Sequence, residues 1–149
     1  MARSLLAVCL VALVVCQSAL PAVAVVLSKC TVAKELYKNG IPKSKIPDWL
    51  CLIQHESSYN TAATNVNNKG TVDESKDNGI FQINDRYWCG ENAVGGDCKL
   101  KCSSLLNSDI TDDIKCAKHI YSLQGFDAWY GWKNHCQGVT LPSISGCGI

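Results

Sequence analysis

Ten cysteines restrict how this chain of 149 residues can fold more than any other feature of its sequence. Eight of them lie after residue 24, at Cys30, Cys51, Cys89, Cys98, Cys102, Cys116, Cys136 and Cys147. An even number of cysteines in a small exported chain is typical of a disulfide framework. Eight cysteines can pair in on the order of a hundred ways, so the sequence alone does not choose the connectivity.

Zinc coordination is the alternative use of so many cysteines. Only Cys98 and Cys102 are close enough in sequence to resemble a pair of zinc ligands, and no second close pair or His-x-x-x-His motif accompanies them. A structural zinc site needs four ligands. We therefore expect disulfides, and neither a metal nor a cofactor.

The first 24 residues have the pattern of a secretory signal peptide. Arg3 supplies the positive charge, residues 5–15 form an apolar run, and a small-x-small cleavage site ends at Ala24. The run is too short for a stable membrane span, although an uncleaved anchor is the alternative. We expect cleavage after Ala24, which removes Cys9 and Cys16, and secretion of residues 25–149 to the extracellular space.

Length and charge limit the possible partners. A chain of this length predicts one domain with a real hydrophobic core. It has 14 basic and 13 acidic residues, and loss of Arg3 with the signal peptide leaves 13 of each. Because there is no basic stripe, a nucleic-acid partner is not expected. We expect a monomer that acts on neither nucleic acid nor membrane.

Apolar residues at helical spacing predict helices near residues 32–37, 49–56, 109–121 and 128–136. Between them, residues 60–76 are rich in Asn, Thr, Ser, Gly and Asp, and this composition predicts turns and a small antiparallel sheet. Helices that flank a small sheet indicate the α+β class.

Two carboxyls occupy contrasting positions on either side of this polar segment. Glu56 ends an apolar helical run, whereas Asp77 opens a strand-like run from a polar turn. Environments that separate the pKa values of two facing carboxyls can make one a general acid and the other a base or nucleophile. The alternative is that both are solvated surface acids.

Aromatic residues follow the strand-like run that Asp77 opens. Tyr87 and Trp88 lie in a loop beside polar Asn and Gln residues. Flat aromatic faces of this kind suit the lining of a carbohydrate cleft, but they could equally cap the core.

Taken together, these patterns resemble the c-type lysozymes, in the insect-like form of the lysozyme/α-lactalbumin family. The resemblance covers the whole of residues 25–149. The motifs that carry it are the eight-cysteine spacing, Cys51-x-x-x-x-Glu56-Ser57, Asp77-x-Gly79-Ile80-Phe81-Gln82-Ile83-Asn84, Trp88-Cys89 and Ala128-Trp129-x-x-Trp132-x-x-x-Cys136.

The resemblance implies a two-lobed α+β domain, mostly helical, with a cleft between the lobes and four disulfides. The implied pairs are Cys30–Cys147, Cys51–Cys136, Cys89–Cys102 and Cys98–Cys116. By matching position, Glu56 would be the catalytic acid and Asp77 the second carboxylate. The implied substrate-binding residues are Asn84, Tyr87, Trp88, Ala128 and Trp129.

The implied reaction is hydrolysis of the β-1,4 links between N-acetylmuramic acid and N-acetylglucosamine in bacterial peptidoglycan. Lysozymes are a type case of this two-carboxyl chemistry with retention of configuration. Such an enzyme serves antibacterial defence or the digestion of bacteria, and needs no cofactor. A sugar-binding relative without activity is the main alternative, but relatives of that kind commonly lose one of the two carboxyls, and both are present here.

Three features depart from the family pattern. Residues 65–77 form a segment about four residues longer than in hen-like members, a length change that loops tolerate. Asn78 stands where Tyr is usual, and the expected mature charge is near zero. The first two concern the shape of the cleft near Asp77, and the third predicts weak attraction to anionic cell walls.

A partial calcium motif lies further along the chain. It consists of Ser104, Asn107, Asp109, Asp112 and Asp113, which resemble the calcium loop of α-lactalbumins. Acidic residues at the start of a helix are also explained by the helix dipole, and we favour that explanation.

Overall fold

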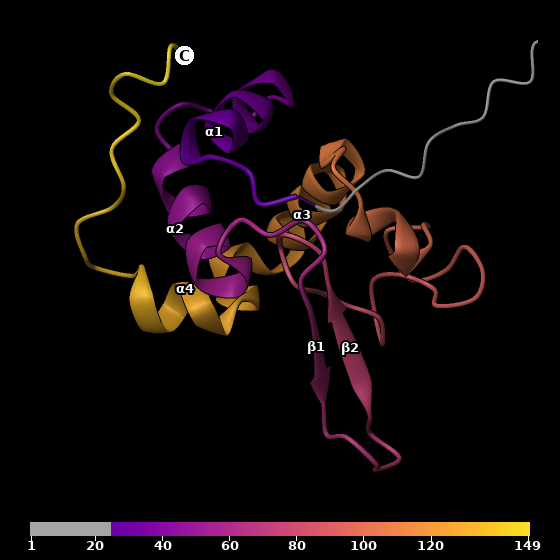
Figure 1. Cartoon of the computed structure of the whole chain (residues 1–149). Coiled ribbons are helices and arrows are strands. Elements are labelled where there is room, and N and C mark those ends of the chain that lie inside the picture. The colour runs from indigo at the N-terminus through magenta and orange to yellow at the C-terminus, as the bar shows by residue number, and fades with distance from the viewer. Residues whose placement is uncertain (1–24) are drawn as a thin grey trace, which may run out of the picture.

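The computed structural model of this protein describes residues 25–149, and the predicted signal peptide lies outside the described residues (Figure 1). Its elements, in chain order, are α1 (Lys29–Lys38), α2 (Ile46–Ser57), β1 (Thr64–Asn67), β2 (Ser75–Asn78), β3 (Ile83–Asn84), the 3-10 helix η1 (Cys102–Leu106), α3 (Thr111–Gln124), the 3-10 helix η2 (Gly125–Ala128) and α4 (Tyr130–His135). Helices with a small antiparallel sheet confirm the predicted α+β class. Within the described part of the chain, no helix is long and apolar enough to span a membrane.

The helices and the sheet form two regions. Figure 1 shows α1, α2, α3 and α4 gathered together, with β1 and β2 extending away from them as a hairpin. The strand order is β1-β2-β3, and the register places Asp77 opposite Asn65 on one side and opposite Asn84 on the other. The sheet therefore brings three polar residues side by side.

Local sequence explains where the central helix begins and ends. Pro47 occupies the first turn of α2, where its missing N–H has no helical partner to lose. The helix ends at Ser57. The next residue, Ser58, adopts a left-handed conformation (φ 51°) and donates its N–H to the Gln54 carbonyl. Glu56 consequently lies in the last turn, at the edge of the helical region.

The third predicted helix begins two residues later than expected. It was predicted from Asp109, but α3 starts at Thr111. The Asp109 carboxylate accepts a hydrogen bond from the Thr111 N–H at 3.0 Å, so Asp109 caps the preceding turn and does not form part of the helix.

The core is built around the indole of Trp49. Its ring meets Phe81 and Trp129 edge-on, at centroid distances of 5.7 and 5.5 Å, and Phe126 at 4.9 Å. Phe81 comes from the turn before β3, whereas Trp129 comes from the segment before α4. This cluster packs the sheet region against the helices, and so fixes where the two meet.

Four disulfides tie the fold together: Cys30–Cys147, Cys51–Cys136, Cys89–Cys102 and Cys98–Cys116. They are the pairs that the resemblance implies. The second bridge joins α2 to the end of α4, and the last two hold the loop after β3 against η1 and α3. All eight sulfurs are oxidised in pairs, which leaves none of them as a thiolate for zinc.

Candidate active site

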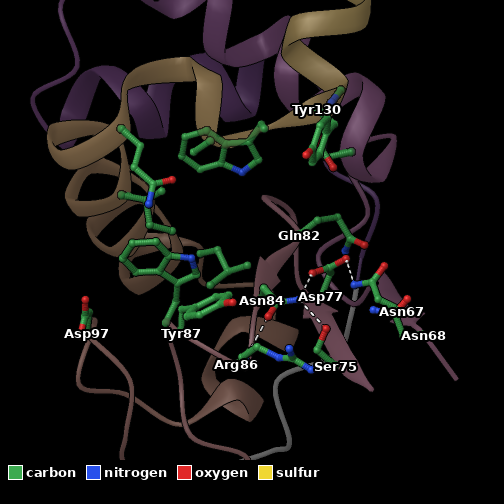
Figure 2. Close-up of a pocket in the computed structure, with 18 residues that line it drawn as sticks. Asn67, Asn68, Ser75, Asp77, Gln82, Asn84, Arg86, Tyr87, Asp97 and Tyr130 are labelled. Atoms are coloured by element: carbon green, nitrogen blue, oxygen red, sulfur yellow. Dashed lines mark hydrogen bonds between the residues drawn. The ribbon is translucent and has the colours of Figure 1, made fainter. Parts of the chain in front are cut away.

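A cleft of about 970 Å³ lies where the helices meet the sheet, and Figure 2 shows the residues that line it. All seven residues that the sequence predicts for the site line this one cleft: Glu56, Asp77, Asn84, Tyr87, Trp88, Ala128 and Trp129. They come from α2, β2, β3, the loop after β3, η2 and the start of α4.

Glu56 is partly withdrawn from water at the end of α2. Burial raises the pKa of its carboxyl above the ordinary value, and the charge of Asp77 adds to this. One backbone contact opposes the shift, because the Gly131 N–H donates to Glu56 Oε1 at 3.0 Å. The result is a carboxyl that keeps its proton to a higher pH than an exposed glutamate, as a general acid requires.

Two buried hydrogen bonds fix the surroundings of Glu56. Ser57 donates its hydroxyl to the Ile80 carbonyl at 2.7 Å, which joins the end of α2 to the sheet region. The indole N–H of Trp129 donates to the Phe81 carbonyl at 2.9 Å, and Trp129 is only 5% exposed. Both acceptors lie in the turn before β3. The two bonds therefore attach the end of α2 and the Trp129 ring, which lines the cleft, to that one turn.

Asp77 has a different environment, in which amide groups supply a donor to each oxygen. Asn67 donates to Oδ2 and Asn84 donates to Oδ1, both at 2.7 Å, as Figure 2 shows. An ionised carboxylate is purely an acceptor, so this arrangement suits the charged form. The antiparallel sheet creates the arrangement, since Asn84 lies directly opposite Asp77.

The neighbouring charge of Lys76 is directed elsewhere. Adjacent residues of a strand point to opposite faces of the sheet, and the Lys76 ammonium pairs with Glu91. The polar contacts of the Asp77 carboxylate therefore come from its two amide partners, and the lysine that precedes it makes none.

Both departures near Asp77 have structural explanations. Asn78 is 4% exposed and donates to the Ile83 carbonyl at 3.3 Å, so it points into the protein and leaves the cleft lining unchanged. The longer β1–β2 hairpin does reach the cleft. Asn68 at its tip lines the cleft, and Asp73 pairs with Arg86, another lining residue, at 3.2 Å.

Exposed aromatic rings stand at two places along the cleft. Tyr87 is 61% exposed, and Trp88 beside it packs edge-on against His119 at 6.3 Å. Tyr130 is 78% exposed and lies near the other end of the view in Figure 2. These rings offer flat apolar faces of the kind that sugar rings bind.

Sequence reasoning missed three lining residues that bear on the two carboxyls or on the aromatic wall: Asn67, Tyr130 and Gly131. Asn67 could be found only from the register of the sheet, which composition does not give. Gly131 acts through its backbone N–H, and a side chain there would place a Cβ 2.5 Å from Glu56 Oε1. Tyr130 was visible within the Ala128–Trp132 motif but carried no distinguishing signal.

The acidic segment before α3 is used for local capping. Asn107 accepts a hydrogen bond from the Asp109 N–H at 2.8 Å, and Asp109 accepts one from Thr111. Asp113 turns inward instead, is 1% exposed, and neither of its oxygens has a hydrogen-bond partner among the described residues. Asn107 and Asp109 therefore act as local caps before α3, whereas the buried Asp113 is not the exposed, dipole-stabilised acid that the sequence favoured.

Comparison with known proteins agrees with this geometry. The pattern of the C-type lysozyme/alpha-lactalbumin family matches residues 25–147. "Lysozyme c-1" of Anopheles gambiae is 56% identical over 119 residues, or 80% of this chain and 82% of that protein. "Lysozyme" of Bombyx mori is 54% identical over 121 residues, or 80% and 85%. "Lysozyme C" of Oryctolagus cuniculus is 46% identical over 133 residues, or 83% and 99%.

Two of these three relatives are insect proteins, which confirms the insect-like resemblance. The family match extends over nearly all of the described residues. This chain therefore belongs to the C-type lysozyme/alpha-lactalbumin family.

Proposed function

We propose that this protein is a muramidase, a glycoside hydrolase that cleaves the β-1,4 link between N-acetylmuramic acid and N-acetylglucosamine in bacterial peptidoglycan. The observation that carries the proposal is the pair of contrasting carboxyls in one cleft. Glu56 is partly buried with a raised pKa, whereas both oxygens of Asp77 accept amide hydrogen bonds. The relatives named lysozyme support it.

The first step assigns one role to each carboxyl. Glu56 donates its proton to the glycosidic oxygen as the bond from that oxygen to the anomeric carbon breaks. Positive charge develops on the sugar ring, and the Asp77 carboxylate stabilises it or bonds to the anomeric carbon on the opposite face. Asn67 and Asn84 hold the Asp77 oxygens in place for this step.

The second step reverses the proton transfer. Glu56, now a carboxylate, accepts a proton from a water molecule as the water oxygen bonds to the anomeric carbon and the Asp77 oxygen leaves that carbon as a free carboxylate. The sugar leaves with its original configuration, and Glu56 regains its proton for the next cycle. No cofactor takes part.

The cleft supplies the groups that would hold a polysaccharide. We propose that Tyr87 and Trp88 stack against sugar rings on one side of the scissile bond, and that Asn84, Ala128 and Trp129 complete the binding surface. Their apolar faces and edge donors match the two kinds of surface that a sugar ring presents. We further propose that the chain is secreted as a monomer after cleavage behind Ala24, for defence against bacteria or for their digestion.

The test is a cell-wall clearing assay on residues 25–149, with the variant Glu56→Gln beside the wild type. Glutamine keeps the shape of the side chain but cannot donate the proton, so we expect the rate to fall by about 10²–10⁴-fold with the fold unchanged. Glu35→Gln is the matched control, because Glu35 lies on α1 and only forms a surface ion pair with Lys38 at 3.5 Å. Clearing by Glu56→Gln at the wild-type rate would overturn the assignment.

A further inference from the structure

Two histidines stack against each other beside the cleft. His55 lies on α2 immediately before Glu56, and His135 is the last residue of α4. Their ring centroids are 4.3 Å apart and their planes differ by 11°. Both side chains are exposed, so the pair can exchange protons with solvent.

A disulfide holds the stack in place. Cys51 lies one helical turn before His55, Cys136 directly follows His135, and the two cysteines are bonded. One atom each of Cys51, His55 and Cys136 lie within 4.8 Å of one another, but both sulfurs belong to the disulfide. Because the imidazole lone pairs lie in the ring planes, two parallel rings direct them side by side, away from a common metal ion.

The stack and Glu56 belong to the same contact between α2 and α4. The Gly131 N–H that donates to Glu56 is in the first turn of α4, and His135 is at the other end of that short helix. A Cβ at residue 131 would lie 3.5 Å from the Cβ of His55. Movement of α4 relative to His55 would therefore also move the Gly131 donor relative to Glu56.

We propose that His55 and His135 act as one proton-binding unit that positions α4, and with it the Gly131 N–H, against Glu56. The two histidines are positioning residues, because neither lines the cleft. This inference rests on the proposed muramidase function and adds a pH-dependent control of its acid.

Electrostatics makes the pair take up its two protons at separate pH values. A second positive charge placed about 4 Å from the first is repelled even in water, so the second proton binds at a lower pH than the first. The pKa of His55 is already lowered by burial and by the charge of His135. The first proton can bind to either ring, whereas the second places two positively charged rings next to each other.

Other charged groups face this contact and belong in the balance. The nearest is Glu56, whose pKa is lowered by the charge of His135 and raised by the charge of Asp77 across the cleft. Asp48 on α2 accepts a hydrogen bond from the Trp132 indole at 3.1 Å. Lys133 on α4 lies over the Tyr130 ring at 5.7 Å.

Two consequences follow as the pH falls. The first proton places a positive charge near Glu56 and favours loss of the catalytic proton. The second proton places two positive charges at a contact that the Cys51–Cys136 bridge keeps closed, and so weakens the packing of α4 on α2 without separating the bridged ends. Replacement of His135 removes the positive charge, so Glu56 should hold its proton to a higher pH.

The direct test is an NMR titration of the His55 ring protons in wild type and His135→Gln. We expect the pKa of His55 to rise when His135 is replaced, because the charge of His135 lowers it. His119→Gln, which removes the third histidine on α3, is the control and should leave the His55 titration unchanged. If the His55 curve does not respond to loss of His135, the proposal is wrong.

The second test is the pH profile of kcat/KM for hydrolysis. We expect His135→Gln to move the basic limb upward, because the charge of His135 lowers the pKa of Glu56. A uniform fall in rate at every pH would instead indicate a merely structural role and would overturn the proposal. The titration needs no activity, so an inactive wild type would overturn the muramidase function while the coupling of the two rings could still be measured.

Discussion

The cleft and the start of α3 each hold a carboxyl away from water, but the two carboxyls differ in their hydrogen-bond partners and in their access to a ligand. In the cleft, Glu56 is partly buried, receives one backbone N–H, and faces a space that a substrate can enter. At the start of α3, Asp113 is sealed in the core with no hydrogen-bond partner among the described residues. Burial raises the pKa of both groups, and that of Asp113 reaches about 9.

The comparison shows that burial of a carboxyl can serve catalysis in one place and affect only stability in another. In the proposed mechanism, a raised pKa at Glu56 leaves a proton where a glycosidic oxygen can receive it. The proton on Asp113 faces only protein, so it can affect nothing but stability. A shifted pKa therefore indicates a functional group only when the group also has access and positioned partners.

After Glu56→Gln, the largest expected effect is at the second carboxyl of the cleft. Asp77→Asn keeps the shape but removes the negative charge that opposes the developing positive charge of the sugar, and it replaces one acceptor with an NH2 group that faces an amide donor. We expect kcat to fall by about 10²–10³-fold, as measured by clearing and by release of reducing ends. Glu74→Gln, exposed on the same hairpin and outside the cleft lining, should stay close to wild type. Full activity of Asp77→Asn would make Asp77 an ordinary surface acid.

The next effect is on stability, at Asp113. The folded state keeps this proton up to about pH 9, whereas the unfolded chain releases it near the ordinary value of 3.8. Between these values the unfolded state binds fewer protons, so the free energy of unfolding falls as the pH rises. Asp113→Asn removes that dependence, and should stabilise the protein by about 2 kcal/mol or more at pH 7.

Thermal unfolding at pH 4 and pH 7 measures this effect. The variant should unfold several degrees higher than wild type at pH 7 and at nearly the same temperature at pH 4. Asp112→Asn is the comparison variant. Asp112 lies in the same turn of α3 but is only half-buried, and its charge raises the pKa of Asp113 less than burial does, so its replacement should have a smaller effect. Equal effects of the two variants would show that helix-dipole electrostatics, and not burial of Asp113, governs the region.

The same contrast explains what the sequence could predict. Motif spacing placed Glu56 and Asp77 correctly in one cleft, since both sit in recognisable runs at the end of a helix and the start of a strand. The burial of Asp113 was not predictable. Its position in the first turn of a helix favoured an exposed, dipole-stabilised acid, and only tertiary packing turns it inward.

Contacts that depend on the tertiary arrangement were missed for the same reason. The Gly131 donor is a backbone group with no side-chain signal, and Asn67 reaches Asp77 only because of the sheet register. The His55–His135 stack joins two helices that are distant in sequence. Local pattern locates the reacting groups, whereas their partners come from long-range packing.

The smallest expected effect is that of variants that remove the hydrogen-bond donors of Asp77 and leave its charge in place. These variants make Asp77 more like Asp113, which has no hydrogen-bond partner among the described residues. Asn67→Ala takes away the donor to Oδ2, and loss of one such bond should lower kcat by up to about tenfold. Asn84→Ala should do the same through Oδ1, with an added rise in KM if Asn84 also binds substrate. Lys76→Gln removes an adjacent charge that pairs with Glu91, and should change kcat by less than about twofold. Steady-state kinetics on a soluble oligosaccharide separates kcat from KM for all three variants. If Lys76→Gln were as damaging as Asn67→Ala, net charge near Asp77 would matter more than its two positioned amides.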